Sequence, residues 1–392
     1  MVKDWQSTTI GELLDFKNGL NKEKSFFGFG TPIVNYTDVY HHNGLHSDHI
    51  KGKVSLSKDE IRRFEVRKGD VFFTRTSETP DEVGISSVLL DEIQDCVFSG
   101  FILRGRPKTD KLLPEYCQYC FSSKKVRDEI IKHCTYTTRA LTNGKVLSAI
   151  DISIPEIDEQ RAIADAFARI EAHIANLTEL IEKKKAIRDG ALEDLVSGRT
   201  RLEGQTISWV DTELGELATY RKGNGLATKD HYISTENINQ GFNGIRRYST
   251  RDVVEGCAFY ETDTLIANIR PYLRKVWYAE FSGICSLDVL ALQPKPAIDP
   301  KYLYYLVAND RFINYVMNGG VKGIKMPRGD KKFMLKYSVR IPSDKAIQAE
   351  LAQMITSMDD EIASLEAERD KMQQIKAGMM DDLLTGRVRL IG

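Results

Sequence analysis

The feature that most constrains this chain is an internal repeat. The segment from Trp5 to Leu13 (WQSTTIGEL) returns from Trp209 to Leu217 (WVDTELGEL). A second repeated pair lies further along, where an Ile-Pro step precedes a long helical pattern that ends in Leu-x-x-Gly-Arg-x-Arg-Leu. Both pairs keep their residue order with almost no insertion, so the chain reads as A-B-A′-B′. The other members of the repeat are Phe16–Gly19 with Tyr220–Gly223, Ile154-Pro155 with Ile341-Pro342, and Leu195–Leu202 with Leu383–Leu390.

Each B segment has the apolar periodicity of a long helix. Steps of four and three residues place one apolar seam on each helix, and such a seam predicts packing against another helix. We expect helices over residues 158–196 and 346–384, the first about 58 Å long at about 1.5 Å per residue, paired antiparallel with one another. The alternative is that each helix packs independently on its own domain. The predicted seam residues are Ile163, Phe167, Ile170, Ile174, Leu177 and Ile181 in the first helix and Leu351, Ile355, Met358, Ile362 and Leu365 in the second, where Arg369 breaks the sixth place.

The ends of both helices carry recognisable signals. Asp158 is the predicted N-cap of the first helix, and Gly198 and Gly386 are predicted C-terminal caps. Gly190 and Gly378 lie at equivalent positions inside the helices, where either a close helix crossing or local flexibility would account for them. Antiparallel pairing also predicts that the chain end, residues 387–392, returns to the first domain.

The A segments have the pattern of mixed α and β structure. Short β-rich runs at residues 70–74, 85–90 and 263–267 lie between turn residues, and helices beginning at Pro114 and Pro300 open with the proline that a first turn permits. The predicted fold class is therefore α+β, with two pseudo-symmetric mixed α/β globular domains separated by an antiparallel coiled coil of two long helices. The predicted boundaries are 1–155 and 205–342 for the domains, and 156–204 and 343–392 for the spacer helices.

Charge and cysteine content restrict the classes of partner. The 55 lysines and arginines nearly balance 56 aspartates and glutamates, so any attraction to nucleic acid must come from local clusters. The six cysteines are too sparse for a secreted disulfide framework and are expected to be reduced. The sequence shows neither a signal peptide nor a run of about 20 apolar residues. We therefore expect a cytoplasmic protein.

Two groups of residues are of types that bind metal ions, and the repeat allows each group to be compared with its counterpart in the second copy. Cys117 and Cys120 have a spacing compatible with zinc, together with His133 and Cys134. Their counterparts in the second copy are Leu303 and Leu306, which favours buried apolar positions. The second group, the histidines at 41, 42, 46 and 49, has no matching ligand set in the second copy, so a solvated or DNA-facing loop is favoured. No metal site is predicted.

Signatures of catalysis are missing from the sequence. Phe27-Gly-Phe-Gly30 lacks the third glycine of a dinucleotide-binding loop, and Asn143-Gly-Lys145 lacks the upstream glycine of a phosphate-binding loop. There is no Gly-x-Ser-x-Gly elbow. There is also no Asn-Pro-Pro-Tyr or Asp-Pro-Pro-Tyr segment that would place a target amine for methyl transfer. The length of the chain is explained without an active site.

Basic, polar and aromatic residues gather in two pairs of predicted loops. One loop follows a strand in each A domain, and another precedes each long helix. Arginine in such loops can bind guanine edges or phosphates, and Asn or Thr can add hydrogen bonds. For any single residue the alternative is an ordinary solvated side chain. The candidate DNA-binding residues are Arg75, Thr76, Ser77, Arg139, Asn143, Asn268, Arg270, Tyr272, Arg274, Lys275, Lys325 and Arg328.

Taken together, these residues resemble the specificity subunits of Type I restriction-modification systems. The resemblance covers the whole chain. It rests on the Trp-x-x-Thr-x-[Ile/Leu]-Gly-Glu-Leu openings, the LIANIRPYLRK segment from Leu265 to Lys275, the Ile154-Pro155 step with Glu159-Gln160-Arg161, and the two Leu-x-x-Gly-Arg-x-Arg-Leu helix ends. The second helix start departs from this pattern, with Ala346-Ile347-Gln348 in place of Glu-Gln, and so its first residue stays open.

The resemblance implies a non-catalytic subunit with two target recognition domains, each of which reads one half of a split DNA site. It implies docking of two methyltransferase subunits, and of two ATP-driven restriction subunits in the full complex. No cofactor is expected on this chain, whereas S-adenosylmethionine, ATP and Mg²⁺ are expected on the partners. Two alternatives come from other classes: a two-headed protein–protein adaptor with incidental DNA binding, and a stand-alone enzyme.

Overall fold

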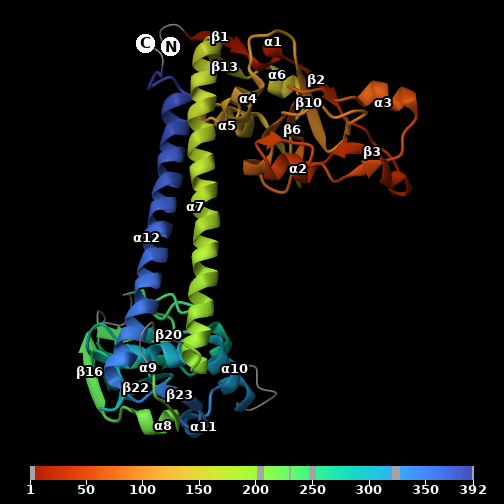
Figure 1. Ribbon diagram of the computed structural model, residues 1–392. Helices are drawn as coiled ribbons and strands as arrows, with labels where there is room; N and C mark the ends of the chain where they lie inside the picture. Colours follow the sequence, from red (N-terminus) through yellow and green to blue (C-terminus); the bar gives the residue numbers. More distant parts are fainter. Residues whose placement is uncertain (1–4, 201–206, 229–230, 247–252, 320–326, 391–392) are drawn as a thin grey trace. The chain divides into compact units, whose positions relative to one another are not determined.

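The computed structural model describes residues 5–200, 207–228, 231–246, 253–319 and 327–390 (Figure 1). Contacts divide the chain into two compact units, one made of Met1–Leu177 with Glu368–Gly392 and the other of Thr178–Ala367. Each unit holds one globular domain together with a segment of each long helix. No described helix is long and apolar enough to cross a lipid bilayer.

The first unit is built on a five-stranded sheet buried on both faces. Its strand order is β2-β10-β6-β8-β4, antiparallel except for β4 against β8. Side chains alternate along β6 (Val71–Thr74), so that Val71 and Phe73 enter one apolar core and Phe72 enters another. The other strands of this sheet are β2 (Leu14–Asn18), β4 (Gly44–Leu45), β8 (Ser86–Leu89) and β10 (Ile102–Pro107).

Shorter elements complete this domain around the five-stranded sheet. The helix α4 (Pro114–Cys120) packs on β8 and fills the first core, and two three-stranded sheets, β5-β3-β9 and β11-β12-β7, lie beside the main sheet. The remaining elements are β1 (Gln6–Thr9), α1 (Ile10–Leu13), η1 (Lys24–Phe26), β3 (Phe27–Val34), α2 (Tyr36–His41), β5 (Lys53–Val54), α3 (Lys58–Phe64), β7 (Thr76–Ser77), η2 (Pro80–Glu82), β9 (Val97–Phe98), α5 (Lys124–His133), β11 (Thr135–Tyr136), β12 (Ala140–Leu141), α6 (Gly144–Ser148) and β13 (Asp151–Ile154).

The second unit repeats the plan of the first. Its central sheet has the order β15-β22-β19-β20, and along β19 (Thr264–Ala267) Leu265 and Ile266 again enter two different cores. The expected strands at 70–74, 85–90 and 263–267 and the proline-opened helices are confirmed. The remaining elements are β14 (Trp209–Glu213), α8 (Leu214–Leu217), β15 (Ala218–Tyr220), β16 (Asn224–Thr228), β17 (Tyr232–Ile233), β18 (Val253–Phe259), η4 (Pro271–Leu273), β20 (Val276–Tyr278), β21 (Gly283–Cys285), β22 (Val289–Pro294), α9 (Pro300–Val307), α10 (Asp310–Gly319), α11 (Lys331–Leu335) and β23 (Ser338–Pro342).

The two long helices are α7 (Ile157–Ser197) and α12 (Lys345–Leu383). In the first unit they are joined by an ion pair of 2.7 Å between Lys376 Nζ and Glu171 Oε1. In the second unit Arg188 Nε lies 2.7 Å from Asp359 Oδ1. A second pair in each unit, His173 with Glu368 and Lys184 with Glu361, shows the direction. Within each unit residue numbers rise along α7 as those of their partners fall along α12, so the helix segments are antiparallel there, as the repeat predicts.

A tyrosine from each domain joins these ion pairs. In the first unit the hydroxyl of Tyr119, on α4, donates to Glu171 at 2.8 Å. In the second, Tyr305 on α9 donates to Asp359 at 2.9 Å. Burial is the main cause that raises the pKa of both phenols above its ordinary value. One hydrogen-bonded group thus links the domain to both long helices in each copy.

The predicted seam is shared between helix pairing and domain packing. Ile163 and Phe167 are buried in the first domain's core beside Leu383 at the end of α12, and Leu351 and Ile355 are buried in the core of the second unit. Helix pairing and its alternative, packing of each helix on its own domain, therefore both hold in part, because the first turns of each helix also cover their own domain. Leu177, Ile181 and Ile362 are buried, and Ile170, Ile174, Met358 and Leu365 are half-buried.

The helix ends confirm one cap prediction and correct another. Gly198 and Gly386 adopt φ values of 69° and 70°, the left-handed conformation that ends a helix on glycine. Asp158 is not the N-cap, because α7 already begins at Ile157 and the carbonyl of Glu156 accepts the first helical hydrogen bonds. The Asp158 carboxylate instead lies in the first turn, where the helix dipole favours a negative charge.

The expected close crossing at the internal glycines is wrong. A Cβ built on Gly190 or Gly378 would meet no atom within 4 Å. Both positions lie on exposed helix surface, so neither helix needs glycine there for its own packing.

The chain end returns to the first domain, as antiparallel pairing predicts. Arg389 donates from Nε to Oε1 of Glu159 at 2.5 Å and from Nη2 to Oε2 at 2.7 Å. The same buried carboxylate accepts the indole N–H of Trp5 at 3.2 Å. Three residues distant in sequence therefore meet at the start of α7.

A buried glutamine fixes the start of each long helix. Gln160 accepts the N–H of Leu113 at 3.0 Å, and Gln348 accepts the N–H of Asp299 at 2.8 Å. Each amide also donates to backbone carbonyls, among them that of Pro155 or Pro342. The departure at Ala346-Ile347-Gln348 is resolved in this way, because Gln348 takes the same role as Gln160 in a helix that begins at Lys345.

Candidate nucleic-acid interface

The two predicted loops of the first domain are hydrogen-bonded to one another. Thr76 on β7 pairs with Leu141 on β12, and the N–H of Thr142 donates to the carbonyl of Arg75 at 3.0 Å. The small sheet β11-β12-β7 therefore brings the segment after β6 and the segment before α7 onto one surface. Sequence reasoning placed both segments among the candidates but gave no sign that they pair.

The candidates of the first domain divide into two groups. Arg75 and Thr76 are half-buried on the small sheet, and Arg139 is exposed between β11 and β12. Ser77 is buried and donates to Glu82 at 2.5 Å. Asn143 accepts the N–H of Val146 at 3.0 Å as the N-cap of α6. The side chains of Ser77 and Asn143 are thus used in internal hydrogen bonds.

Glu82 is held as a carboxylate by the hydroxyl groups around it. The Ser77 hydroxyl, and after it the Tyr40 hydroxyl, lower the pKa of Glu82 below its ordinary value. The backbone carbonyl of Glu82 also accepts the Thr74 hydroxyl at 2.8 Å, so both the side chain and the main chain of Glu82 are held beside β6 and β7.

The second domain repeats this pairing with different residues. Ile269 forms an antiparallel bridge with Arg328, and the N–H of Arg270 donates to the carbonyl of Pro327 at 2.9 Å. Asn268 directly follows β19, as Arg75 directly follows β6, so the two residues are counterparts by strand position. Asn268 is only 8% exposed, and its Oδ1 has no hydrogen-bond partner among the described residues.

An unusual backbone displays the next candidates of the second domain. Arg270 and Arg274 have φ values of 52° and 55°, a left-handed conformation that costs about 1 kcal/mol in a residue other than glycine. They flank η4, which exposes Tyr272. Such strain often marks a functional segment.

The other basic candidates of this domain have intramolecular partners. Arg274 forms an ion pair of 2.7 Å with Asp310, and Arg328 forms one of 3.1 Å with Asp288. Lys275 donates to the carbonyl of Thr235 at 2.6 Å, and burial is the main cause that lowers its pKa. Lys325 lies outside the described residues.

The residues first considered for metal binding have other surroundings. Cys117 and Cys120 are buried in the first apolar core, where the repeat predicts apolar side chains, and burial raises the pKa of Cys120. His46 hydrogen-bonds to Asp91 at 3.0 Å, and the rings of His42 and His49 stack 4.0 Å apart. Within the described part of the chain no group of three or more His, Cys, Asp or Glu side chains is arranged to hold a metal ion.

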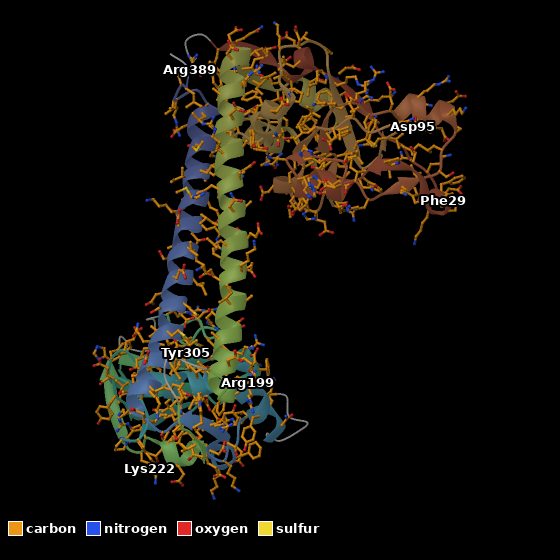
Figure 2. The ribbon with its side chains drawn as sticks, viewed as in Figure 1. Phe29, Asp95, Arg199, Lys222, Tyr305 and Arg389 are labelled. Carbon is orange, nitrogen blue, oxygen red and sulfur yellow. The ribbon has the colours of Figure 1, made fainter. Side chains whose placement is uncertain are left out.

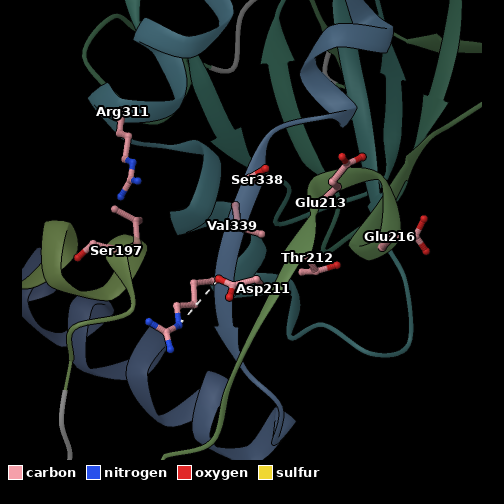
Figure 3. A pocket seen from close by; sticks show the side chains of 10 residues that line it. Ser197, Asp211, Thr212, Glu213, Glu216, Arg311, Ser338 and Val339 are labelled. Carbon is pink, nitrogen blue, oxygen red and sulfur yellow. Dashed lines mark ion pairs between the residues drawn. The ribbon is translucent and has the colours of Figure 1, made fainter.

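Equivalent cavities lie where a long helix ends against each domain. In the second unit a cavity of about 540 Å³ is bounded by Ser197 at the end of α7, by β14 and β23, and by Arg311 on α10 (Figure 3). Asp211 and Arg340 face one another on its wall at 3.9 Å. The cavity of the first unit, about 290 Å³, lies between β1, β13, α5 and the end of α12 at Leu384. The repeat thus extends to the concave surfaces.

In each domain two loop segments are paired through their backbones, residues 75–77 with 140–142 in the first and 268–270 with 327–328 in the second, and we call these the reader segments. Two domains of one plan, each with such reader segments and each joined to a long helix, define the class of duplicated recognition proteins. A family model described as the Type I restriction modification DNA specificity domain matches residues 2–186 and again residues 207–376. The chain belongs to this family. The resemblance seen in the sequence is confirmed.

Curated relatives and solved structures agree with this assignment. The chain is 28% identical over 176 residues to the EcoKI specificity subunit of Escherichia coli K12, a match over 44% of this chain and 36% of that subunit. It is 19% identical to a putative MjaX specificity subunit of Methanocaldococcus jannaschii, over 99% of this chain and 94% of the relative. The first of these matches spans only about a third of the relative's length.

The fold is shared with solved specificity subunits. The S subunit of a Type I restriction-modification system from M. genitalium aligns with a TM-score of 0.56 at 17% identity, covering 97% of this chain and 96% of that one. The HsdS subunit from Thermoanaerobacter tengcongensis aligns with a TM-score of 0.54 at 14% identity, covering 98% of both chains.

Proposed function

We propose that this chain is the DNA-reading, non-catalytic subunit of a Type I restriction-modification complex and that each domain reads one half of a two-part DNA site. The observation that carries the proposal is the backbone pairing of two candidate loop segments in each unit, a small sheet in the first and a single bridge in the second. Family membership supplies the context. The sequence differences between these segments, such as Arg75 in one and Asn268 in the other, support two different half-sites.

The arginines of the reader segments suit a DNA groove. Arg75 and Arg139 in the first domain and Arg270 in the second carry planar guanidinium groups, which bind guanine edges or phosphates through two hydrogen bonds. Asn268 has a carbonyl oxygen without a described partner, and burying such an atom costs free energy unless a partner arrives.

The assembly is proposed from the duplication. Two equivalent sets of helix surface and joint cavity favour two copies of a partner, so we propose two methyltransferase subunits and two restriction subunits per chain. S-adenosylmethionine, ATP and Mg²⁺ are proposed to be held by those partners. The described residues of this chain are explained as scaffold and reader.

The test is DNA binding by the chain assembled with its methyltransferase subunits. Binding to a duplex that carries the site, found by mapping methylated bases in the host genome, is expected to weaken steeply as salt rises, since phosphate contacts release counterions. Arg75→Ala and Arg270→Ala are each expected to cost about 1 to 3 kcal/mol of binding free energy if they read bases. Arg62→Ala, at an exposed arginine of α3, is the matched control.

Two results would contradict the proposal. Salt-independent binding would favour the protein–protein adaptor, whose packed interface responds little to ions. Methyl transfer by the purified chain alone would favour a stand-alone enzyme.

A further inference from the structure

Each domain exposes a large apolar side chain to solvent on an equivalent turn. Phe101 is 65% exposed in the turn from Ser99 to Ile102, which leads into β10. Leu287 is 80% exposed in the turn before β22. Among the exposed large apolar side chains described, these two have the highest exposed fractions.

The two turns are the same structure built from different residues. Each begins with a serine that follows a short strand, β9 or β21, and each closes with a hydrogen bond from the first residue of the next strand back to that serine. A third hydrogen bond joins each turn to the reader segment. The pairs, as N–H donor and carbonyl acceptor, are Ser99 to Val34, Ile102 to Ser99 and Arg75 to Phe101 in the first domain, and Ser286 to Ile233, Val289 to Ser286 and Asn268 to Asp288 in the second.

These hydrogen bonds fix the exposed side chains beside the reader residues. The carbonyl of Phe101 accepts the N–H of Arg75 at 3.1 Å, so the ring projects from a residue bonded directly to a reader segment. Leu287 precedes Asp288, which accepts the N–H of Asn268 at 2.8 Å and whose carboxylate pairs with Arg328. Both turns are therefore held in place and are not loose loops.

The surroundings indicate what covers these side chains. Burying a large apolar side chain contributes about 1.5 to 3 kcal/mol, which neither Phe101 nor Leu287 gains within its own domain. Arg75, which is bonded to Phe101, and Arg328, which pairs with Asp288 next to Leu287, are cationic. The partner is therefore expected to be anionic yet to offer apolar surface next to its charges. A DNA groove has both features, because phosphates line its edges and thymine methyl groups and base faces lie between them.

We propose that Phe101 and Leu287 are base-contacting residues, each inserted into the groove of the half-site that its own domain reads. This inference rests on the proposed function and adds to it the apolar part of recognition. The difference between a phenyl ring and a branched aliphatic chain at the same turn would contribute to the different base preference of the two domains.

The experiment measures binding of Phe101→Ala and Leu287→Ala, in the full chain assembled with methyltransferase subunits. Each variant is expected to bind the site duplex about 10-fold or more weakly, the loss of contact of one buried apolar side chain. The slope of affinity against salt should be unchanged, because no phosphate contact is lost. Discrimination should fall at one half-site only, the first for Phe101 and the second for Leu287.

Phe29→Ala is the matched control. Phe29, labelled in Figure 2, is 57% exposed on β3 in the same domain and is not part of the turn from Ser99 to Ile102. The Phe29→Ala variant should bind the site duplex like the wild type. Phe101→Leu and Leu287→Phe test folding, since they keep an apolar contact and should retain binding while altering base preference.

Several outcomes would overturn the inference. Wild-type affinity of both alanine variants would remove these side chains from the interface. An equal loss on unrelated duplex DNA, or a reduced salt slope, would indicate a backbone contact or a general defect in place of a base contact. If the wild-type complex itself binds no site duplex, the proposed function fails, which is distinguishable from failure of the variants alone.

Discussion

At the scale of single residues, the two copies keep a buried carboxylate while changing its partner. Asp70 and Asp263 each precede the central strand of their sheet and are almost fully buried. Asp70 pairs with Arg106 from β10, whereas Asp263 pairs with Arg221, which follows β15. Both arginines bind in the two-pronged manner. A buried charge requires a partner but can accept it from different strands of the sheet, so the sequences diverged without losing the ion pair.

Another residue-scale ion pair exists in only one described copy. Glu159, buried between Trp5 and Arg389, has Ile347 as its counterpart before the second buried glutamine. The first unit therefore depends on a charge to hold the chain end. The partner position in the other copy, Arg201, lies outside the described residues.

Glu159→Gln should destabilise the protein. The substitution leaves Arg389 without its anionic partner, which we expect to cost about 1 to 3 kcal/mol, less than for a fully buried pair because Arg389 is partly exposed. The midpoint of thermal unfolding should fall by several degrees. Glu156→Gln, at an exposed position one turn earlier, should leave it unchanged. Equal midpoints for the two variants would show that the pair contributes little.

At the scale of elements, each long helix presents the same exposed surface near its end. Ile187 is 59% exposed on α7, and its counterpart Ile375 is 40% exposed on α12. Gly190 and Gly378 follow three residues later on the same helix face, with open space around them. Each glycine costs about 1 kcal/mol relative to alanine in a helix interior. A partner that approaches the backbone closely would account for both costs.

Ile187→Glu and Ile375→Glu should therefore weaken capture of methyltransferase subunits. Glutamate is a good helix former, so folding should be retained, while a charge within an apolar contact opposes docking. The double variant should lose both subunits and each single variant one, as measured by the mass of the assembled complex. Leu180→Glu is the control, because Leu180 is exposed on α7 but its counterpart in α12 is Glu368. Full assembly of the double variant would place the docking surface elsewhere.

At the scale of the whole molecule, the duplication and the length of the two helices bear on the spacing between the two halves of the DNA site. The helices α7 and α12 have 41 and 39 residues, and ion pairs join them in both units. We propose that the helix pair sets the number of unread base pairs between the half-sites. The gap can be changed without disrupting the helix pair only if both helices change length together.

Inserting seven residues into each helix, after Ile174 and after Leu365, should lengthen the unread gap. Seven residues keep the apolar seam in register and add about 10 Å, which corresponds to about three base pairs at about 3.4 Å each. Base-resolution mapping of methylation by the altered complex measures the gap. The same insertion in α7 alone should abolish site-specific methylation, since it removes the register of the pair. An unchanged gap in the double insertion would eliminate the proposed spacing role.

The sequence alone determined the repeat, both long helices to within about a residue, the main strands and the glycine caps. These features are local, because apolar periodicity and capping chemistry act over a few residues and leave a readable pattern. The family followed from the same local motifs. The cysteines of the Cys-x-x-Cys pair were also assigned to the core correctly, because their counterparts in the second copy are Leu303 and Leu306.

Only the tertiary structure decided which candidates lie together and which are already used. Ser77 and Asn143 were predicted to face DNA but are held by Glu82 and by the start of α6. The pairing of β7 with β12 joins residues more than 60 positions apart, and only the structure shows that Phe101 and Leu287 face water. Hydrogen bonds and burial between distant segments decide these matters, and no pattern of neighbouring residues encodes them.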